Sequence, residues 1–193
     1  RPLGFGYANI GAAAMSLGLP YDSDKARTFT AGVTDYITAV AYSTSNELAK
    51  ARGAFPKFKE NKSSMLEVIL KHKNEDAKLD PAALGQNSEL VTQARQIWQQ
   101  NLQNGEKSGF KNDQVTLLAP TGTIGFLMEC DTTGVEPDGA LVKYKQLVGG
   151  GSMRIVNGTV RKALETLGYD KEQTEKIIGY IDTITSSDKI EAK

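Results

Sequence analysis

Residue types that build many familiar functional sites are scarce in this sequence of 193 residues. It has one cysteine, Cys130, so an intrachain disulfide is impossible and a cysteine-rich zinc site is excluded. Its one histidine, His72, argues against a histidine metal site and against a Ser/His/Asp triad. We therefore expect no metal site in the chain.

An excess of charge of either sign is also lacking, because Lys plus Arg and Asp plus Glu number 23 each. A net charge of zero gives no electrostatic reason to expect a nucleic acid or a membrane surface as partner. No apolar run of about 18 residues is present, so we expect no membrane span. No signal-peptide pattern opens the sequence, which favours a cytoplasmic protein. The chain begins with Arg1 rather than Met, and we interpret it as a fragment.

Apolar residues at helical spacing dominate what is present, in a composition typical of globular proteins. The pattern predicts helices from about Tyr7, over 23–52, from about Ser64, over 88–105, after Gly151 and after Asp170. Small residues in the first of these would let another backbone approach closely. The helix after Gly151 would carry an apolar face made of Met153, Val156, Val160, Leu164 and Leu167. The polar tail over 185–193 is expected to fray.

For three side chains that could carry chemistry, we favour a plainer interpretation. His72 could be an acid or a base, but between two lysines it fits a solvated helix face. Trp98 could stack on a nucleotide base, but it lies on an apolar helix stripe and is expected in the core. Cys130 could be a reactive thiol, but its acidic neighbours disfavour a thiolate, so we expect a structural residue.

The segment over 114–125 is the part of the sequence that most resembles a functional site. Residues 114–119 are apolar and β-branched, which predicts a buried strand. A turn then opens a helix, and its residues are Pro120, Thr121, Gly122, Thr123 and Ile124. Free N–H groups at a helix start, together with threonine hydroxyls and a glycine that admits close approach, form an anion site. From spacing alone, a plain strand-to-helix turn capped by threonine is the more common alternative.

Three stretches together resemble the adenosylcobalamin-dependent, or class II, ribonucleotide reductases. They are RPLGFGYANIGAAAMSLGLPYDSD at 1–24, SNELAKARGAFPKF at 45–58 and LAPTGTIGFLMECDTTGVEPDGALVKYKQLVGGG at 118–151. The looser pattern of the last stretch is also similar to class I large subunits, but APTGTIGF followed by CDTTGVEPD is the class II form. The resemblance covers nearly the whole chain.

The resemblance implies a helix-rich α/β fold that forms the second half of a ten-stranded α/β barrel. Residues 1–193 would then be part of a catalytic barrel domain. The family's radical-forming cysteine and one cysteine of its reducing pair would lie before Arg1, and the other would lie after Lys193. Cys130 matches neither role. The chain would therefore contain no catalytic residue and would be inactive alone.

The resemblance also implies an activity, the radical reduction of ribonucleotides to 2'-deoxyribonucleotides for DNA synthesis, with adenosylcobalamin as cofactor of the complete enzyme. In the family, the turn that matches Pro120, Thr121, Gly122, Thr123 and Ile124 binds the phosphates of the substrate. The implied partners are a ribonucleoside di- or triphosphate, a thioredoxin-type reductant and a second copy in a homodimer. Two alternatives stay open: a fragment of a class I large subunit, and a non-catalytic module that binds nucleotide phosphates.

Overall fold

The computed structural model describes residues 1–184, so the fraying predicted for 185–193 lies outside the described residues. The chain forms two compact units. Unit 1 comprises residues 1–6 and 27–118, and unit 2 comprises residues 7–26 and the described chain from Ala119 onward. Most of the described residues are helical and one two-stranded sheet accompanies them, which agrees with the helix-rich α/β class expected from the sequence.

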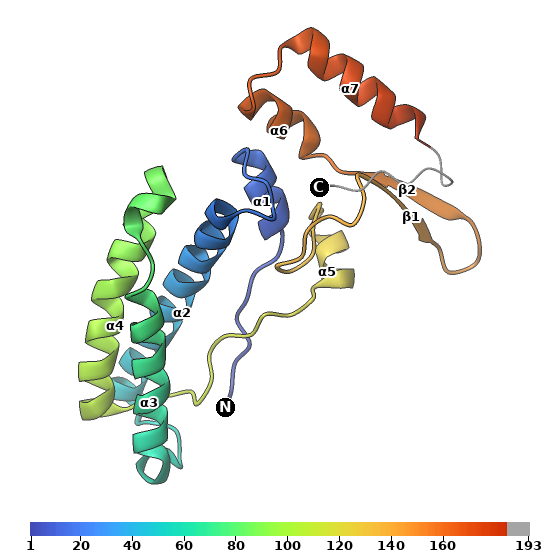
Figure 1. The fold of residues 1–193 in the computed structure, drawn as a ribbon. Helices are drawn as coiled ribbons and strands as arrows, with labels where there is room; N and C mark the ends of the chain where they lie inside the picture. The colour runs from blue at the N-terminus through green and yellow to red at the C-terminus, as the bar shows by residue number, and fades with distance from the viewer. Residues whose placement is uncertain (185–193) are drawn as a thin grey trace. The chain divides into compact units, whose positions relative to one another are not determined.

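The elements in chain order are α1 (Ile10–Ser16), α2 (Asp24–Arg52), α3 (Phe58–Asp76), the 3-10 helix η1 (Pro81–Asn87), α4 (Ser88–Ser108), α5 (Gly122–Leu127), β1 (Val142–Gln146), β2 (Ser152–Val156), α6 (Val160–Thr166) and α7 (Lys171–Thr183) (Figure 1). Among the residues described, no helix has the length and apolar character needed to cross a membrane.

Unit 1 is built on α2, α3 and α4, whose apolar faces enclose one core (Figure 1). Ile69 from α3 and Trp98 from α4 are both fully buried there, and Phe110 closes the end of the core. The rings of Tyr42 and Phe110 meet edge to face with centroids 5.7 Å apart, a favourable aromatic arrangement. The predicted core position of Trp98 is therefore confirmed.

The long helix predicted over 23–52 is confirmed as α2. At its start, the Ser23 hydroxyl oxygen accepts a hydrogen bond from the Ala26 N–H at 3.2 Å. At its end, Gly53 has a φ of 75° and donates its N–H to the Ala49 carbonyl oxygen at 2.8 Å. A glycine in this left-handed conformation is a common way for a helix to end. Local signals at both ends thus explain why this helix could be predicted.

The buried strand predicted over 114–119 is wrong. The segment is extended, but it forms only an isolated parallel bridge, between Phe5 and Thr116. Leu117 and Leu118 are each 52% exposed, so the described residues leave much of this segment uncovered. Apolar and β-branched residues favour a strand where neighbouring strands complete the sheet, and here residues 3–5 are the partner that unit 1 supplies.

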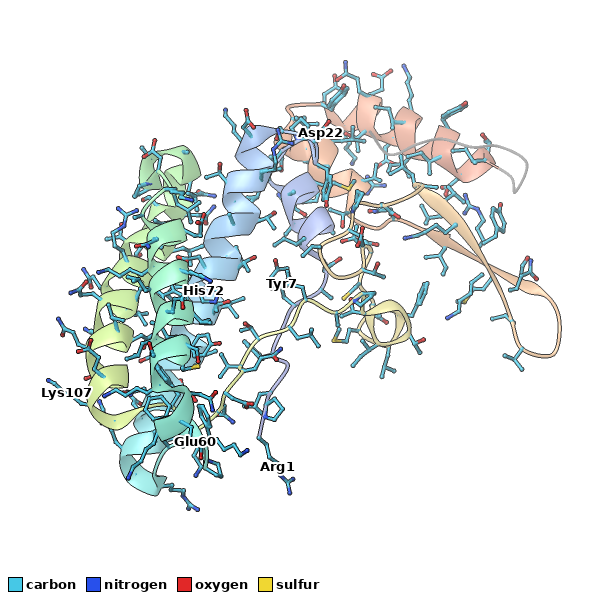
Figure 2. All side chains as sticks on the ribbon, turned by 60° about the horizontal axis from the view of Figure 1, so that its bottom comes forward. Arg1, Tyr7, Asp22, Glu60, His72 and Lys107 are labelled. Carbon is cyan, nitrogen blue, oxygen red and sulfur yellow. The ribbon has the colours of Figure 1, made fainter. Side chains whose placement is uncertain are left out.

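The solvated position predicted for His72 is also wrong. His72 lies on α3, which begins at Phe58 rather than at Ser64, and its side chain is half-buried (Figure 2). Its ring stacks on Trp98 with centroids 5.1 Å apart and an angle of 5° between the planes. Burial lowers the pKa of His72 below its ordinary value. The flanking lysines were misleading because neighbours in sequence point to different faces of a helix.

Unit 2 holds α1, α5, the hairpin of β1 and β2, α6 and α7. The two strands are antiparallel, with Val142 opposite Val156. A small apolar core gathers Val160, Ile181 and Ile184. The final helix, predicted after Asp170, begins with a capping box, in which the Asp170 carboxylate accepts from the backbone of Gln173 and the Gln173 side chain accepts from the backbone of Asp170.

The helix predicted after Gly151 begins later than expected, at Val160. Met153 and Val156, which the sequence assigned to a helical face, lie in β2 instead. The run Gly149–Gly151 has φ values of 97°, 101° and 87°, a region that glycine adopts readily and other residues do not. The glycine run therefore reverses the chain, and pairing with β1 makes the next five residues a strand.

The small residues of α1 allow the close backbone approach that the sequence predicted. Ala12 and Ala14 are each 2% exposed. A Cβ atom on Gly11 would lie 2.6 Å from the carbonyl oxygen of Glu136, closer than side-chain carbons come to oxygen. The helix starts at Ile10, slightly later than predicted.

Candidate functional site

The predicted anion-binding turn stands at the start of α5. Thr121 precedes the helix in a left-handed conformation, with φ 54° and ψ 38°. The first hydrogen bond of the helix runs from the Gly125 N–H to the Thr121 carbonyl oxygen at 2.9 Å. The N–H groups over 122–124 come before this bond and have no acceptor within the helix. The helix start therefore presents adjacent donors without helical partners.

The turn is accessible. Pro120, Gly122, Thr123 and Ile124 are exposed, and Thr121 is half-buried. A Cβ atom on Gly122 would meet no atom within 4 Å, so the space beside this residue is open. The structure thus places all five predicted residues in one exposed turn.

Thr121 has a second function within this turn. Its Oγ1 accepts a hydrogen bond from the Gly134 N–H at 2.6 Å. A Cβ atom on Gly134 would lie 2.7 Å from the Ala119 carbonyl oxygen, so the two backbones are in close contact. The Thr121 oxygen therefore fixes the turn against the neighbouring loop, whereas Thr123 is exposed.

A lysine that the sequence analysis did not identify lies beside α5. The Lys145 ammonium, from β1, sits 4.0 Å from the centre of the Phe126 ring, within the range of a cation–π interaction. Phe126 lies in the last turn of α5, so this contact places Lys145 beside the C-terminal part of the helix. The sequence signal that could have identified this lysine is the alternation of polar and apolar residues over 142–146, which places every second side chain on the same face of a strand.

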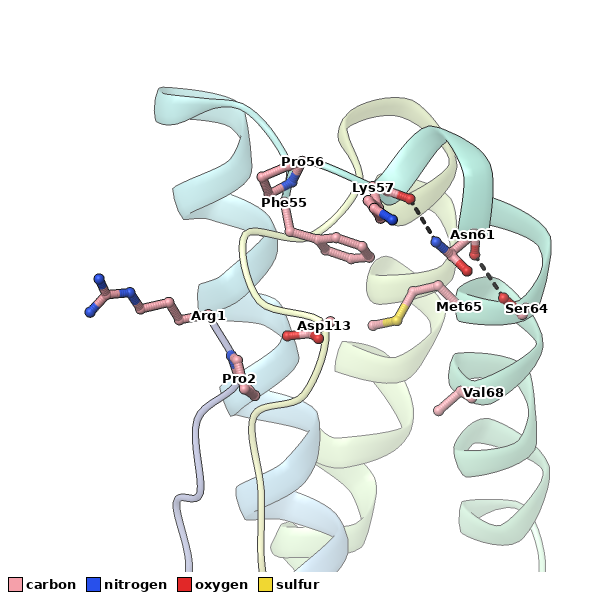
Figure 3. Close-up of a pocket in the computed structure, with 10 residues that line it drawn as sticks. All are labelled: Arg1, Pro2, Phe55, Pro56, Lys57, Asn61, Ser64, Met65, Val68 and Asp113. Carbon is pink, nitrogen blue, oxygen red and sulfur yellow. Dashed lines mark hydrogen bonds between the residues drawn. The ribbon is translucent and has the colours of Figure 1, made fainter.

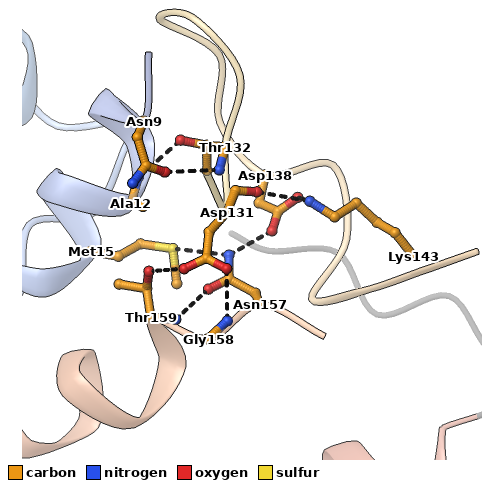
Figure 4. A network of polar contacts seen from close by, with 10 residues as sticks. All are labelled: Asn9, Ala12, Met15, Asp131, Thr132, Asp138, Lys143, Asn157, Gly158 and Thr159. Atoms are coloured by element: carbon orange, nitrogen blue, oxygen red, sulfur yellow. Dashed lines mark hydrogen bonds and ion pairs between the residues drawn. The ribbon is translucent and has the colours of Figure 1, made fainter. Parts of the chain in front are cut away.

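The loop that supports the turn is held by a network of polar contacts (Figure 4). The Asp131 carboxylate accepts hydrogen bonds from the Thr159 hydroxyl and from the Gly158 N–H, the latter at 2.8 Å. The Lys143 ammonium lies 2.8 Å from both the Asp131 carbonyl oxygen and the Asp138 Oδ1. These acids are therefore engaged in bracing the loop.

The network continues toward α1 through Thr132, which is 2% exposed. The Thr132 Oγ1 accepts from the Ala12 N–H at 3.1 Å, and its own N–H donates to the Asn9 Oδ1 at the same distance. The remaining Asp138 oxygen, Oδ2, accepts from the Asn157 Nδ2 at 2.5 Å. The loop over 130–138 is thereby fixed on both sides within unit 2.

Cys130 ends the turn of chain that follows α5. It is half-buried, and its N–H donates to the Gly125 carbonyl oxygen at 2.9 Å. Its Sγ lies 4.0 Å from the Met128 carbonyl oxygen. Within residues 1–184, no group of three or more His, Cys, Asp or Glu side chains is arranged to hold a metal ion.

Two pockets offer alternative sites. One, in unit 1, has a volume of about 540 Å³ and is lined largely by apolar side chains such as Phe55, Met65 and Val68 (Figure 3). Its polar members Asn61 and Ser64 bond to the backbone of their own helix or the residue before it. Three charged residues, Arg1, Lys57 and Asp113, also line it. The other, in unit 2, has a volume of about 300 Å³ between α1 and α6 and is also mostly apolar. The turn at 120–124 remains the better candidate.

Comparison with known proteins gives this turn its context. The family model described as "Ribonucleotide reductase, barrel domain" matches residues 1–193. This chain belongs to that family. The family resemblance found in the sequence is thereby confirmed.

Several relatives of this chain have names that are more specific than the family description. Proteins called "Vitamin B12-dependent ribonucleotide reductase" are 49% identical in Rhodopirellula baltica, 47% in Streptomyces coelicolor and 45% in Agrobacterium fabrum. The matches cover 94%, 94% and 93% of this chain, but only 17%, 19% and 15% of those relatives. The chain therefore spans less than a fifth of the length of each of the three.

Proposed function

We propose that this chain is the part of a cobalamin-dependent ribonucleotide reductase that holds the phosphate end of the substrate, a ribonucleoside di- or triphosphate. The observation that carries the proposal is the start of α5, where free N–H groups and an open space at Gly122 occur together. Membership of the barrel-domain family and the names of the relatives support the reaction class. Those names favour the cobalamin-dependent class over the class I alternative.

The chemistry assigned to the turn is binding and positioning. Phosphate oxygens would accept hydrogen bonds from the N–H groups over 122–124, where the helix dipole favours negative charge. The exposed Thr123 hydroxyl would add to this attraction. Hydrogen bonds to charged groups contribute about 1.5–3 kcal/mol each, so a few suffice to hold a diphosphate. A fixed phosphate would in turn hold the ribose in one place for the reaction.

The residues of this chain do not fit a cobalt-binding role. Its one histidine, His72, is half-buried against Trp98 in unit 1, and its one cysteine packs behind α5. When bound to the complete enzyme, adenosylcobalamin would supply the radical chemistry. This chain would contribute no catalytic residue and would be inactive by itself.

The wider setting is part of the same proposal. The chain would form the second half of a ten-stranded α/β barrel within a longer cytoplasmic enzyme. That enzyme would receive its electrons from a thioredoxin-type reductant and would act as a homodimer. Membership of the barrel-domain family supports the barrel part of this setting.

The proposal predicts that Gly122→Ala and Thr123→Ala, each made in a full-length reductase carrying this segment, raise KM for the substrate tenfold or more. A methyl group at position 122 would occupy the open space that a phosphate needs, and it causes no backbone strain because this glycine has no positive φ. Loss of one charged hydrogen bond corresponds to about tenfold in affinity. Steady-state kinetics with two ribonucleotides that differ in base provide the measurement.

Two controls accompany this experiment. Gly139→Ala also adds a methyl group in open space, at an exposed loop position, and should leave KM unchanged. Thr123→Ser keeps the hydroxyl and should behave like the unaltered enzyme. If Gly122→Ala leaves KM unchanged, or if the effect depends on the base, the turn does not bind phosphate.

A further inference from the structure

Two carboxyl groups meet inside unit 1, away from anything assigned above. Asp35 lies on α2 and Asp76 on α3, and Asp76 is 1% exposed. The Asp35 Oδ1 accepts a hydrogen bond from the Trp98 Nε1 at 2.7 Å. The Asp76 Oδ2 lies 3.3 Å from the Arg95 Nε. Each acid thus has one oxygen with a partner.

The other oxygen of each acid has no hydrogen-bond partner. The Oδ2 of Asp35 and the Oδ1 of Asp76 are both shielded from solvent and unpaired. Leaving a buried acceptor unsatisfied is unfavourable, and more so when it carries charge. One proton placed between two such oxygens would satisfy both, because a carboxylic acid donates the hydrogen bond that a carboxylate accepts.

The balance of charges around the two acids also favours one bound proton. Arg95, from α4, is the cation that contacts Asp76, and its guanidinium also donates to the carbonyl oxygens of Asp76 and Leu79. From α3, Lys73 lines the same surface groove as Asp76 and Arg95. One contacting cation therefore faces two acids.

Among residues 1–184, α3 and η1 contribute further side chains to this part of the bundle. His72, also on α3, stacks on Trp98, and η1 contributes the apolar Leu84 against the Gly32 backbone. Burial and, after it, the Asp76 carboxylate raise the pKa of Asp35 to about 7, although the Trp98 hydrogen bond and Arg95 act in the opposite direction.

We propose that Asp35 and Asp76 share one proton, and that this proton joins α2 to α3 by a hydrogen bond inside the bundle. The bond makes the stability of unit 1 depend on pH. Below about pH 4, Asp35 is protonated in the folded and unfolded chain alike, and the contribution is fully present. Because the folded pKa lies above the unfolded one, the contribution falls as pH rises toward about 7.

The test uses Asp35→Asn in the full 193-residue chain. The asparagine oxygen can still accept from Trp98, and its NH₂ can donate to Asp76 as the shared proton does. The unfolding equilibrium constant of the unaltered chain should therefore rise relative to that of Asp35→Asn, approaching tenfold per pH unit between about pH 4 and 7. Trp98 is the only tryptophan, so its fluorescence follows unit 1 in urea titrations at each pH.

The contribution of His72 must be removed from the comparison, because its effect on stability changes with pH in the direction opposite to that of Asp35. Its folded pKa is lowered, so its contribution to stability is lost as pH falls rather than as it rises. Both chains therefore carry His72→Gln. Glu67→Gln serves as a control, because Glu67 is a solvent-exposed acid on α3, the helix that carries Asp76, and should leave the pH profile unchanged.

Parallel pH profiles for the two chains would overturn the shared proton. A second measurement decides the matter if Asp35→Asn fails to fold. Infrared spectra of the His72→Gln chain should show the carbonyl band of a protonated carboxylic acid at pH 6 that disappears by pH 9. A spectrum without that band at pH 6 would equally overturn the proposal.

Discussion

Three single residues of unit 2 hold unusual backbone conformations, and for two of them a polar side-chain contact accompanies the conformation. Asn9, Thr121 and Glu129 all have φ values between 54° and 70° although none is glycine. Left-handed backbone costs roughly 1–2 kcal/mol for an ordinary residue. For Asn9 and Thr121 the side-chain oxygen accepts an N–H from the loop over 130–138, which offsets that cost. The turn is therefore fixed before any ligand arrives.

The Thr121 contact makes a prediction about stability. Thr121→Val removes the acceptor of the Gly134 N–H and keeps a branched side chain in left-handed backbone. We expect a loss of about 1–3 kcal/mol in the free energy of unfolding, the usual effect of leaving a buried donor unsatisfied. Thr121→Ser keeps the oxygen and should stay within about 0.5 kcal/mol. Chemical denaturation followed by circular dichroism measures both, and equal stability of the two variants would contradict the role assigned to Oγ1.

Whether the contacts of a residue could be predicted depends on how far its partners lie along the sequence. The five residues of the turn could be proposed from the sequence because they are adjacent in it, and their role as a phosphate site stays a prediction. The bond from Gly134 to Thr121 spans 13 positions, and the stack of His72 on Trp98 joins two helices, so neither is visible in local sequence. The pair of Asp35 and Asp76 was missed for the same reason.

At the scale of elements, the helices were predictable and the strands were not. The helices α2, α4 and α7 carry their own apolar spacing and their own end signals, so the sequence predicted them with nearly correct bounds. A strand is defined by what it pairs with. The segment over 114–119 has the composition of a strand, but the segment that pairs with it is too short. The residues of β2 have apolar residues at helical spacing, and their pairing with β1 makes them a strand.

Two helical glycines test how tightly these elements pack. A Cβ atom on Gly105, in α4, would lie 2.7 Å from the Phe110 ring, so Gly105→Ala should destabilise unit 1 by about 1–3 kcal/mol through overpacking. A Cβ atom on Gly179, in α7, would meet nothing within 4 Å. There, alanine should stabilise the helix by up to about 1 kcal/mol. Urea denaturation compares the two variants, and a neutral Gly105→Ala would mean that the Phe110 ring yields easily.

On the scale of the whole molecule, each unit has an apolar core of its own. Trp98 and Phe110 lie in the core of unit 1, and Val160 and Ile181 in the smaller core of unit 2. Unit 2 is also held by polar contacts, since Asp131, Asp138 and Asn157 together connect the loop, the hairpin and the start of α6. A unit held in this way should be sensitive to the loss of one acid.

Asp131→Ala is therefore expected to lower the stability of unit 2 by about 1–3 kcal/mol, because the Gly158 N–H and the Thr159 hydroxyl lose their acceptor. The loss of helical circular dichroism should then begin at a lower urea concentration than the change in Trp98 fluorescence. Asp182→Ala removes an exposed acid 3.8 Å from Arg154 and should change stability by less than about 0.5 kcal/mol. Coincident transitions in Asp131→Ala would show that the network does not govern unit 2 separately.

The scarcity of cysteine and tryptophan has a practical consequence. The single thiol, Cys130, is half-buried and lies in unit 2, directly after the proposed phosphate turn, whereas the single indole, Trp98, lies in unit 1. A thiol-reactive acceptor dye on Cys130 would form a resonance energy-transfer pair with Trp98 without any substitution. If pyrophosphate is then added to the labelled chain, any change in the distance between Cys130 and Trp98 would appear as a change in transfer efficiency.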